Sequence, residues 1–287
     1  MLPTRAKIAV ARAIATPILL ARQLVGRGVE ADVVRHGIRW RLDLREGIDF
    51  AIWLVGRFEG STVRAYEKIV RPGDVVLDIG ANIGAHALPL ARLVGPQGRV
   101  ICFEPTEFAF QKLLANANRN PDLAGRMTLV QAMLVAAATE AVPERLYSSW
   151  PLTSGNDLHA LHRGRPMTTH GARATTLDAA LEEAGVARVN FVKMDVDGYE
   201  CSVLRGARET LRHQPTILLE LAPYALDETG ANIEELVRIL AGAGYALAEL
   251  GSERRIPLDG QAIRALVPSG SSMNVLATRA DVSARLK

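Results

Sequence analysis

The feature that most constrains the fold of this 287-residue chain is a short apolar run that leads into a glycine turn. The run covers residues 75–79, contains Asp78, and is followed by Gly80, Ala81, Asn82, Ile83 and Gly84. An apolar run of this length is typical of a strand buried in a parallel sheet. Glycines between such a strand and a helix let a ligand approach the backbone closely. The sequence therefore predicts a strand–turn–helix unit with a ligand site at the turn.

The alternation of apolar runs and helical patterns continues along the chain. We predict strands at residues 75–79, 99–103, 127–132, 189–194, 216–219, 245–250 and 273–278. We predict helices at residues 61–70, 85–94, 107–118, 177–184, 199–213 and 233–241, the first capped by Ser61 or Thr62. Repeated units of this kind predict an α/β, Rossmann-like doubly wound domain with a mostly parallel, seven-stranded sheet.

Two regions fall outside this regular pattern. Residues 1–58 are expected to form an N-terminal extension, made of a basic helix and short strands that turn at His36 and Gly37. Residues 59–287 are expected to form the main domain, with an irregular insertion near 135–176 that contains a hairpin. We therefore divide the chain into an N-terminal extension and one larger domain.

Acidic residues stand at or near the ends of four predicted strands. These are Asp78, Glu104, Asp195 and Glu220. The carboxyl ends of parallel strands meet at one edge of the sheet, which is where such folds bind ligands. Buried carboxylates are costly unless they are paired or contact a ligand. Their repetition predicts a functional site at this edge.

Charge at the glycine turn indicates which ligand binds there. A dinucleotide would place its diphosphate against the turn, where Asp78 would repel it. S-adenosylmethionine (SAM) has no phosphate and carries a sulfonium and an ammonium group, which Asp78 would attract. Glu104 is placed to accept hydrogen bonds from ribose hydroxyls, a role shared by NAD and SAM proteins. The combination favours SAM.

Composition excludes several classes of protein. Residues 1–30 hold five basic side chains and one acid, whereas the remainder is nearly neutral, so no broad basic face for nucleic acid is indicated. Cys102 and Cys201 are far apart and fit a reducing cytoplasm better than a disulfide framework. The oligomeric state is open.

The basic segment 5–27 has two interpretations. It could be an amphipathic helix that lies peripherally on an anionic membrane, at its inner face. Alternatively, it is a helix that packs on the domain and exposes its arginines to solvent. No stretch reaches the roughly 18–20 apolar residues that span a bilayer.

Three sequence blocks carry a resemblance to a known family. They are PGDVVLDIGANIG at 72–84, GRVICFEP at 98–105, and VKMDVDGYE at 192–200 with VLRGA at 203–207. With them the chain resembles the FkbM family of SAM-dependent methyltransferases over about residues 59–222, with a tail to Thr278. The third block is the most specific, and it departs from the family in having Asp197 where glutamate is usual.

The resemblance implies O-methylation of a hydroxyl on a sugar, glycolipid or natural product. The cofactor residues that we predict are Asp78, Gly80, Ala81, Asn82, Gly84, His86, Glu104, Pro105, Met133 and Asp195. Met133 would lie near the adenine. His86 would touch the methionine end of the cofactor or cap the following helix.

The catalytic base is predicted among the strand-end acids. A hydroxyl nucleophile must lose its proton as it attacks, and Asp195 and Glu220 are the first candidates. Each could instead accept backbone N–H bonds as a cap. A second possibility is a Mg²⁺ site formed by Asp195, Asp197 and Glu220, although no spacing rule compels it. His159, His162 and His170 in the insertion are further candidates if that segment closes over the site.

Two other functions compete with methyl transfer. One is a nucleotide-dependent oxidoreductase on a similar sheet, against which Asp78 argues. The other is a non-catalytic, methyltransferase-like scaffold, which would have no need of an intact glycine turn. Binding of SAM rather than NAD discriminates among the three.

Overall fold

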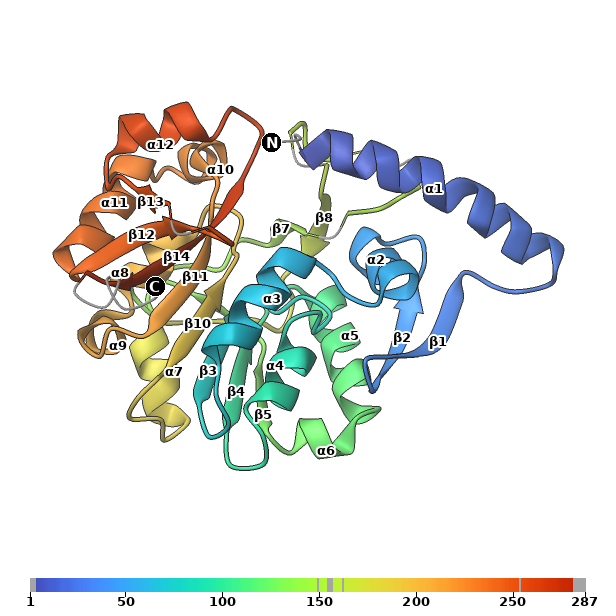
Figure 1. Ribbon diagram of the computed structural model, residues 1–287, viewed down its shortest axis with the longest axis horizontal. Coiled ribbons are helices and arrows are strands. Elements are labelled where there is room, and N and C mark those ends of the chain that lie inside the picture. Colours follow the sequence, from blue (N-terminus) through green and yellow to red (C-terminus); the bar gives the residue numbers. More distant parts are fainter. Residues whose placement is uncertain (1–3, 149, 154–156, 162, 253, 281–287) are drawn as a thin grey trace.

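The computed structural model of the protein describes residues 4–280 except 149, 154–156, 162 and 253. Its centre is an eight-stranded sheet with the strand order β13-β12-β14-β11-β10-β3-β4-β5 (Figure 1). These strands are β3 (Val75–Ile79), β4 (Arg99–Phe103), β5 (Met127–Val130), β10 (Phe191–Met194), β11 (Thr216–Leu221), β12 (Tyr245–Glu249), β13 (Arg255–Ile256) and β14 (Met273–Arg279). Seven of the eight match predicted strands, and β13 adds a two-residue edge. The prediction of an α/β, Rossmann-like fold is confirmed.

The sheet is mostly parallel. β5, β4, β3, β10 and β11 are parallel neighbours, whereas β14 lies antiparallel between β11 and β12. The chain runs outward from β3 through β4 to β5 and then returns to β10 on the other side of β3. The carboxyl ends of β3 and β10 thus flank a topological switch point, which is the usual ligand site of such sheets.

Helices cover both faces of the sheet, as Figure 1 shows. Leu77 and Ile79 of β3 face a core shared with later helices, whereas Val76 faces a core shared with earlier ones. The helices on the first face are α7 (Leu177–Glu183), α8 (Glu200–Arg205), α9 (Arg208–Arg212), α11 (Ile233–Gly242) and α12 (Gly260–Leu266). Those on the second face are α3 (Gly60–Ile69), α4 (Ala87–Leu93) and α5 (Glu107–Asn118). Helix α12 was not predicted, and neither were two shorter helices, α6 (Pro121–Ala124) and α10 (Pro223–Glu228).

Several local predictions differ from the structure. The strand predicted at 127–132 divides into β5 and β6 (Ala132–Leu134), because β6 pairs with β9 (Arg173–Thr175) rather than with β4. The helix predicted at 199–213 is interrupted at Gly206, where an added Cβ would lie 2.3 Å from the carbonyl oxygen of Val135. The predicted cap of α3 is wrong, since Glu59 occupies the N-cap position and makes no capping hydrogen bond.

The N-terminal extension has its own apolar core. It contains α1 (Thr4–Leu24), the hairpin of β1 (Glu30–Arg35) and β2 (Ile38–Asp43), and α2 (Gly47–Val55). Trp40 and Leu42 pack with Ile83 and Leu88, so this core sits directly on the glycine turn and α4. The domain boundary at residue 58 stays a prediction.

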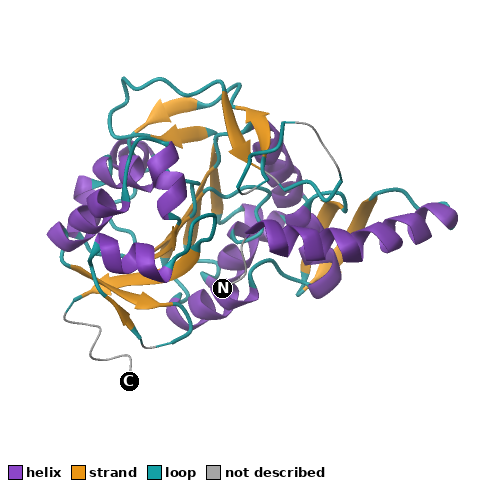
Figure 2. Cartoon of the chain, turned by 90° about the horizontal axis from the view of Figure 1, so that it is seen from above, coloured by secondary structure: helices purple, strands orange, loops and turns teal. Residues whose placement is uncertain are grey.

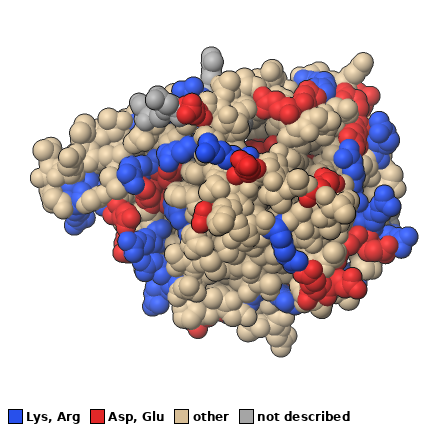
Figure 3. Space-filling view, turned by 180° about the vertical axis from the view of Figure 1, so that it is seen from behind, with Lys and Arg blue, Asp and Glu red and all other residues tan. Residues whose placement is uncertain are grey.

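Helix α1 projects past the rest of the molecule (Figure 2). Figure 3 shows this projecting end, at the left, as mostly uncharged atoms, with charged side chains below it. The described part of the chain contains no helix that is both long and apolar enough to span a membrane.

The insertion contains the expected hairpin. β7 (Arg145–Ser148) and β8 (Arg165–Thr168) pair antiparallel. A bridge between Glu46 and Pro151 joins the insertion to the start of α2. The insertion therefore lies between the extension and the carboxyl edge of the sheet.

Candidate functional site

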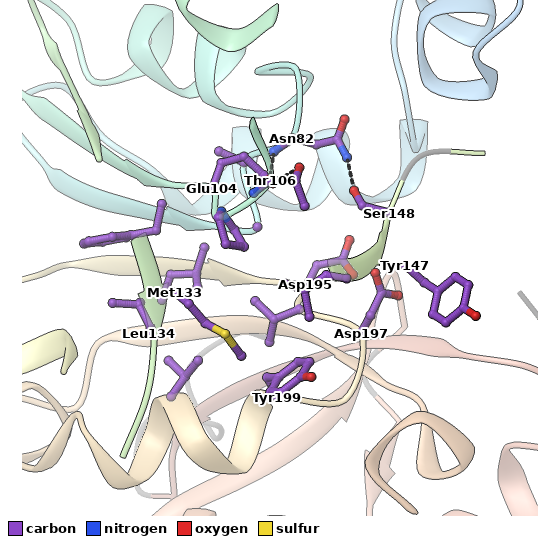
Figure 4. A pocket seen from close by; sticks show the side chains of 18 of the residues that line it. Asn82, Glu104, Thr106, Met133, Leu134, Tyr147, Ser148, Asp195, Asp197 and Tyr199 are labelled. Atoms are coloured by element: carbon purple, nitrogen blue, oxygen red, sulfur yellow. Dashed lines mark hydrogen bonds between the residues drawn. The ribbon is translucent and has the colours of Figure 1, made fainter. Parts of the chain in front are cut away.

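A cavity of about 450 Å³ lies at the switch point, beyond the ends of β3, β4 and β10. Its volume falls within the range of small-molecule sites. Eight of the residues predicted to bind the cofactor line it: Gly80, Ala81, Asn82, His86, Glu104, Pro105, Met133 and Asp195. Figure 4 shows Met133 and Tyr199 across this cavity from Asn82. We call it the first cavity.

Gly80 is required by the neighbouring backbone. Its φ is +81°, and a Cβ at this position would lie 1.9 Å from the carbonyl oxygen of Asp195. The amide of Asp195 in turn donates to the carbonyl of Ile79. The close approach of β3 and β10 thus excludes any larger residue at position 80, before a ligand is considered.

Glu104 organises the turn. Its Oε2 accepts a hydrogen bond from the amide of Asn82 at 2.9 Å, and its Oε1 accepts from the amide and hydroxyl of Thr106 at 2.8 and 2.5 Å. Each carboxylate oxygen has two acceptor sites, so Oε2 keeps one for a ligand hydroxyl. Burial raises the pKa of Glu104, and these hydrogen bonds oppose that rise. The predicted ribose role stays compatible with this geometry.

Asn82 links the turn to the insertion. Its φ is +48°, a backbone conformation that asparagine tolerates better than most residues. Its side chain donates to the Ser148 hydroxyl at the end of β7, at 3.3 Å (Figure 4). The hairpin is thereby held over the first cavity.

Asp78 does not line the first cavity. Its carboxylate is fully buried, and its Oδ1 lies 4.0 Å from the Nζ atom of Lys193 on the adjacent strand β10. Burial raises the pKa of Asp78, and Lys193 opposes the rise. Direct attraction of a sulfonium by Asp78 stays untested, as does a cofactor role for Gly84, which also lies outside the lining.

Lys193 is the main site residue that the sequence reading missed. It is 3% exposed, lines the first cavity, and lies 3.1 Å from Oδ2 of Asp195. Burial lowers its pKa, but the charges of Asp195 and Asp78 outweigh burial and raise it overall. A lysine inside an apolar strand was the available signal, because a buried ammonium requires acidic partners.

A second cavity of about 530 Å³ adjoins the first. Asp195, Asp197, Phe58 and Trp150 line both. The second cavity also contains Glu220 and Tyr224, and its apolar wall includes Ile8 and Ala11 of α1. Asp195 therefore lies on the wall between two spaces of ligand size.

Three carboxylates gather at this wall. Oxygen atoms of Asp195, Asp197 and Glu220 lie within 4.8 Å of one another, an arrangement that could hold a divalent cation. Burial and the charge of Asp195 raise the pKa of Asp197 and of Glu220 well above their ordinary values. Protonation is thus an alternative to a cation for relieving the repulsion.

Glu200 shapes the turn that carries these acids. It is buried at the start of α8, and its Oε1 accepts from the amides of Val196 and Gly198, each at 3.4 Å. Burial raises the pKa of Glu200 to about 7. These contacts place the Glu200 carboxylate at the N-terminus of its own helix.

His86 lines the first cavity and makes no capping hydrogen bond through its side chain. Its Nε2 lies 3.6 Å from Oε2 of Glu59, which also accepts from the Thr62 hydroxyl. Burial alone would raise the pKa of Glu59, but His86 and Lys193 lower it to about 2. His86 therefore occupies the N-cap position of α4, but its side chain does not cap the helix, and contact with a cofactor stays a prediction.

The insertion histidines separate. His159 lines the first cavity and pairs with Glu228 at 3.2 Å. His170 is exposed, and His162 lies outside the described residues. Of the two insertion histidines that the structure describes, His159 is the one that remains a candidate base.

Comparison with known proteins gives a consistent result. The family model of the methyltransferase FkbM domain matches residues 78–247. Hexuronic acid methyltransferase AglP of Haloferax volcanii is 25% identical over 194 residues, which cover 67% of this chain and 72% of AglP. The 31-O-demethyl-FK506 methyltransferase FkbM of Streptomyces tacrolimicus is 31% identical over 205 residues, covering 62% of this chain and 75% of that protein.

Among solved structures, the methyltransferase FkbM of Methylobacillus flagellatus is similar to this chain with a TM-score of 0.42 and 18% identity. The alignment covers 75% of this chain and 50% of that one.

Proposed function

Because the chain belongs to the methyltransferase FkbM domain family, we propose that it transfers the methyl group of SAM to a hydroxyl of a sugar, glycolipid or other natural product. The names of the relatives support this acceptor class, since one acts on a hexuronic acid and the other on an O-demethyl natural product. Family membership speaks against the oxidoreductase alternative.

The single observation that carries the proposal is the position of Asp195 between two cavities. The first cavity has the features that SAM requires: a glycine turn, Glu104 with acceptor capacity to spare, and an apolar strip at Ala132–Leu134. The second cavity offers acids and Tyr224 to a hydroxylated acceptor. SAM supplies an activated methyl group for an in-line displacement.

The protein's own contribution is positioning and proton transfer. Alignment of the reacting groups can supply on the order of 7–11 kcal/mol. Asp195 takes the proton of the acceptor hydroxyl, and Lys193, 3.1 Å from its Oδ2, fixes the direction of the carboxylate. Glu220, whose pKa is raised, is the second candidate base.

The test compares Asp195→Asn with Glu220→Gln. Tritiated methyl transfer is first screened over glycans, glycolipids and hydroxylated small molecules, and SAM binding is followed by calorimetry. Asp195→Asn should lower turnover by about 10²-fold or more while SAM still binds. Glu220→Gln should affect the acceptor KM more than kcat.

Two outcomes would overturn parts of this proposal. Turnover at the wild-type level in Asp195→Asn removes Asp195 from the mechanism and leaves Glu220 and His159 as candidate bases. Failure of the wild-type chain to bind SAM at millimolar concentration restores the scaffold alternative.

A further inference from the structure

Between residues 9 and 24, the outward face of α1 carries no charged side chain. Residues that share this face by helical spacing are all exposed and all apolar: Ala9, Val10, Ala13, Ile14, Pro17, Leu20, Ala21 and Leu24. Leu20 is 57% exposed and Leu24 is 88% exposed. The opposite side of α1 is also apolar, because Ala15 is buried and Ile18 and Leu19 pack against the core of the extension. A helix on a globular domain normally exposes polar residues on its outer side, so the apolar outward face of α1 is unusual.

Two arginines of α1, Arg12 and Arg22, point toward the protein. Arg12 donates to the carbonyl oxygens of Pro151 and Thr153, each at 3.3 Å. Arg22 donates to the carbonyls of Gly28 and Glu30, at 2.9 and 3.0 Å, and lies over the Trp53 ring. These contacts fix the orientation of α1, so the apolar face stays turned to the outside. The helix packs on the domain, as one of the two interpretations of segment 5–27 expected. The inward contacts of Arg12 and Arg22 were anticipated by neither.

Exposed apolar surface is concentrated in the extension. Ten large apolar side chains are exposed in the described part of the chain, and nine of them lie between residues 10 and 55. They are Val10, Ile14, Leu20, Leu24, Val25, Val29, Val34, Leu54 and Val55. An exposed apolar patch of this kind marks an interaction surface.

The charge of the same region indicates the partner. Residues 1–58 contain ten Lys or Arg and five Asp or Glu, whereas the rest of the chain holds slightly more acids than bases. Arg27, just beyond the end of α1, is exposed. An apolar helix face on a cationic segment complements a surface with anionic headgroups over an apolar interior.

We propose that α1 docks in the plane of an anionic lipid surface, with Leu20 and its neighbours on the outward face entering the acyl boundary. A second copy of the chain is the competing occupant. A helix face about 30 Å long and about 10 Å wide offers about 300 Å², against roughly 800 Å² per partner in a standard interface. The area and the charge both favour lipid.

Docking would place the catalytic region beside the membrane. Ile8 and Ala11, on the inner side of α1, line the second cavity. The helix therefore connects the lipid surface with the space proposed for the acceptor. Docking would thus bring the acceptor cavity close to the lipid surface. The docking itself does not depend on the proposed reaction.

The experiment is co-sedimentation of the full chain with sucrose-loaded vesicles. Vesicles of phosphatidylcholine alone are compared with vesicles that also contain phosphatidylglycerol. Leu20→Glu places one charge on the outward face, in the C-terminal half of α1. Gln23→Glu adds the same charge on the same helix, at an exposed position beside that face, and is the matched control.

We expect the wild-type chain to bind the anionic vesicles at least about tenfold more strongly than the neutral ones. Leu20→Glu should lower this binding by about tenfold or more, and Gln23→Glu by no more than about threefold. Circular dichroism and Tm should be unchanged in both variants because both side chains are exposed. If Leu20→Glu does not fold, Ala13→Glu makes the same test two turns earlier.

Three results would overturn the proposal. The first is that the wild-type chain does not bind vesicles. The second is that Leu20→Glu binds them as strongly as the wild type does. The third is that the wild-type chain forms a dimer in light scattering, which Leu20→Glu dissociates, and does not bind vesicles. The last result would assign the face to a second copy.

Discussion

At the scale of single residues, Lys193 compensates the negative charge of the buried carboxylates in the site. It is buried between Asp78 and Asp195, on the strand next to β3. A buried ion pair contributes little net stability compared with apolar residues, but removing one partner leaves an uncompensated charge. The sequence shows a lysine in an apolar run. It does not show the strand register that places Lys193 opposite Asp78.

Replacement of Lys193 by methionine should destabilise the fold by about 3–5 kcal/mol near pH 8. The loss should be smaller near pH 5. Burial raises the folded-state pKa of Asp78 above its unfolded value, and without Lys193 it rises further. Such a group contributes stability below its unfolded pKa and loses it as pH rises toward the folded pKa. Chemical denaturation at both pH values measures the difference.

Arg173→Met is the control for this experiment. Arg173 pairs with Glu183 on the surface, where both side chains are about half exposed. Its loss should cost no more than about 1 kcal/mol at either pH. Equal losses for the two variants would contradict the assigned role of Lys193.

Removal of metal should leave the reaction intact. Lys193 compensates Asp195, and the raised pKa values of Asp197 and Glu220 let protons relieve the remaining repulsion. We expect full activity after exhaustive EDTA treatment. Loss of activity that Mg²⁺ restores would instead assign a cation to the three carboxylates.

At the scale of elements, the sequence predicted the parallel strands well because their signal is local. Apolar runs such as Arg99–Phe103 and the turn residues beside them determine a buried strand without reference to the rest of the chain. The failures depend on tertiary contacts. Residues 132–134 leave the sheet to pair with β9, and Gly206 ends α8 against Val135, which no local pattern reveals.

The contact between β3 and β10 gives a second prediction at this scale. Gly80→Ala would place Cβ against the carbonyl of Asp195, in addition to the strain of a positive φ. Gly73 has φ +91°, and a Cβ added there would meet no atom within 4 Å, so Gly73→Ala isolates the strain alone.

We expect Gly73→Ala to cost about 1–2 kcal/mol, and Gly80→Ala to cost clearly more and to weaken SAM binding. Thermal denaturation and calorimetry measure the two effects. Similar costs for both variants would show that β3 and β10 can separate without penalty.

At the scale of the whole molecule, the site is assembled from three parts of the chain. The sheet supplies the glycine turn, Glu104 and Asp195, the insertion supplies Ser148 and Trp150, and the extension supplies Ile8 and Ala11. The first group could be predicted because its residues follow strands of one sheet. The other two could not, since 135–176 lacks a regular pattern and α1 is apolar on both its inner and its outer side.

The central claim is that the first cavity binds SAM beside the acid at position 104. The most direct measurement is a crystal structure of the protein with S-adenosylhomocysteine. We expect the ribose hydroxyls within hydrogen-bond distance of Glu104 and the adenine beside Met133. A first cavity left empty at saturating ligand, or one that takes a nicotinamide nucleotide instead, would contradict it.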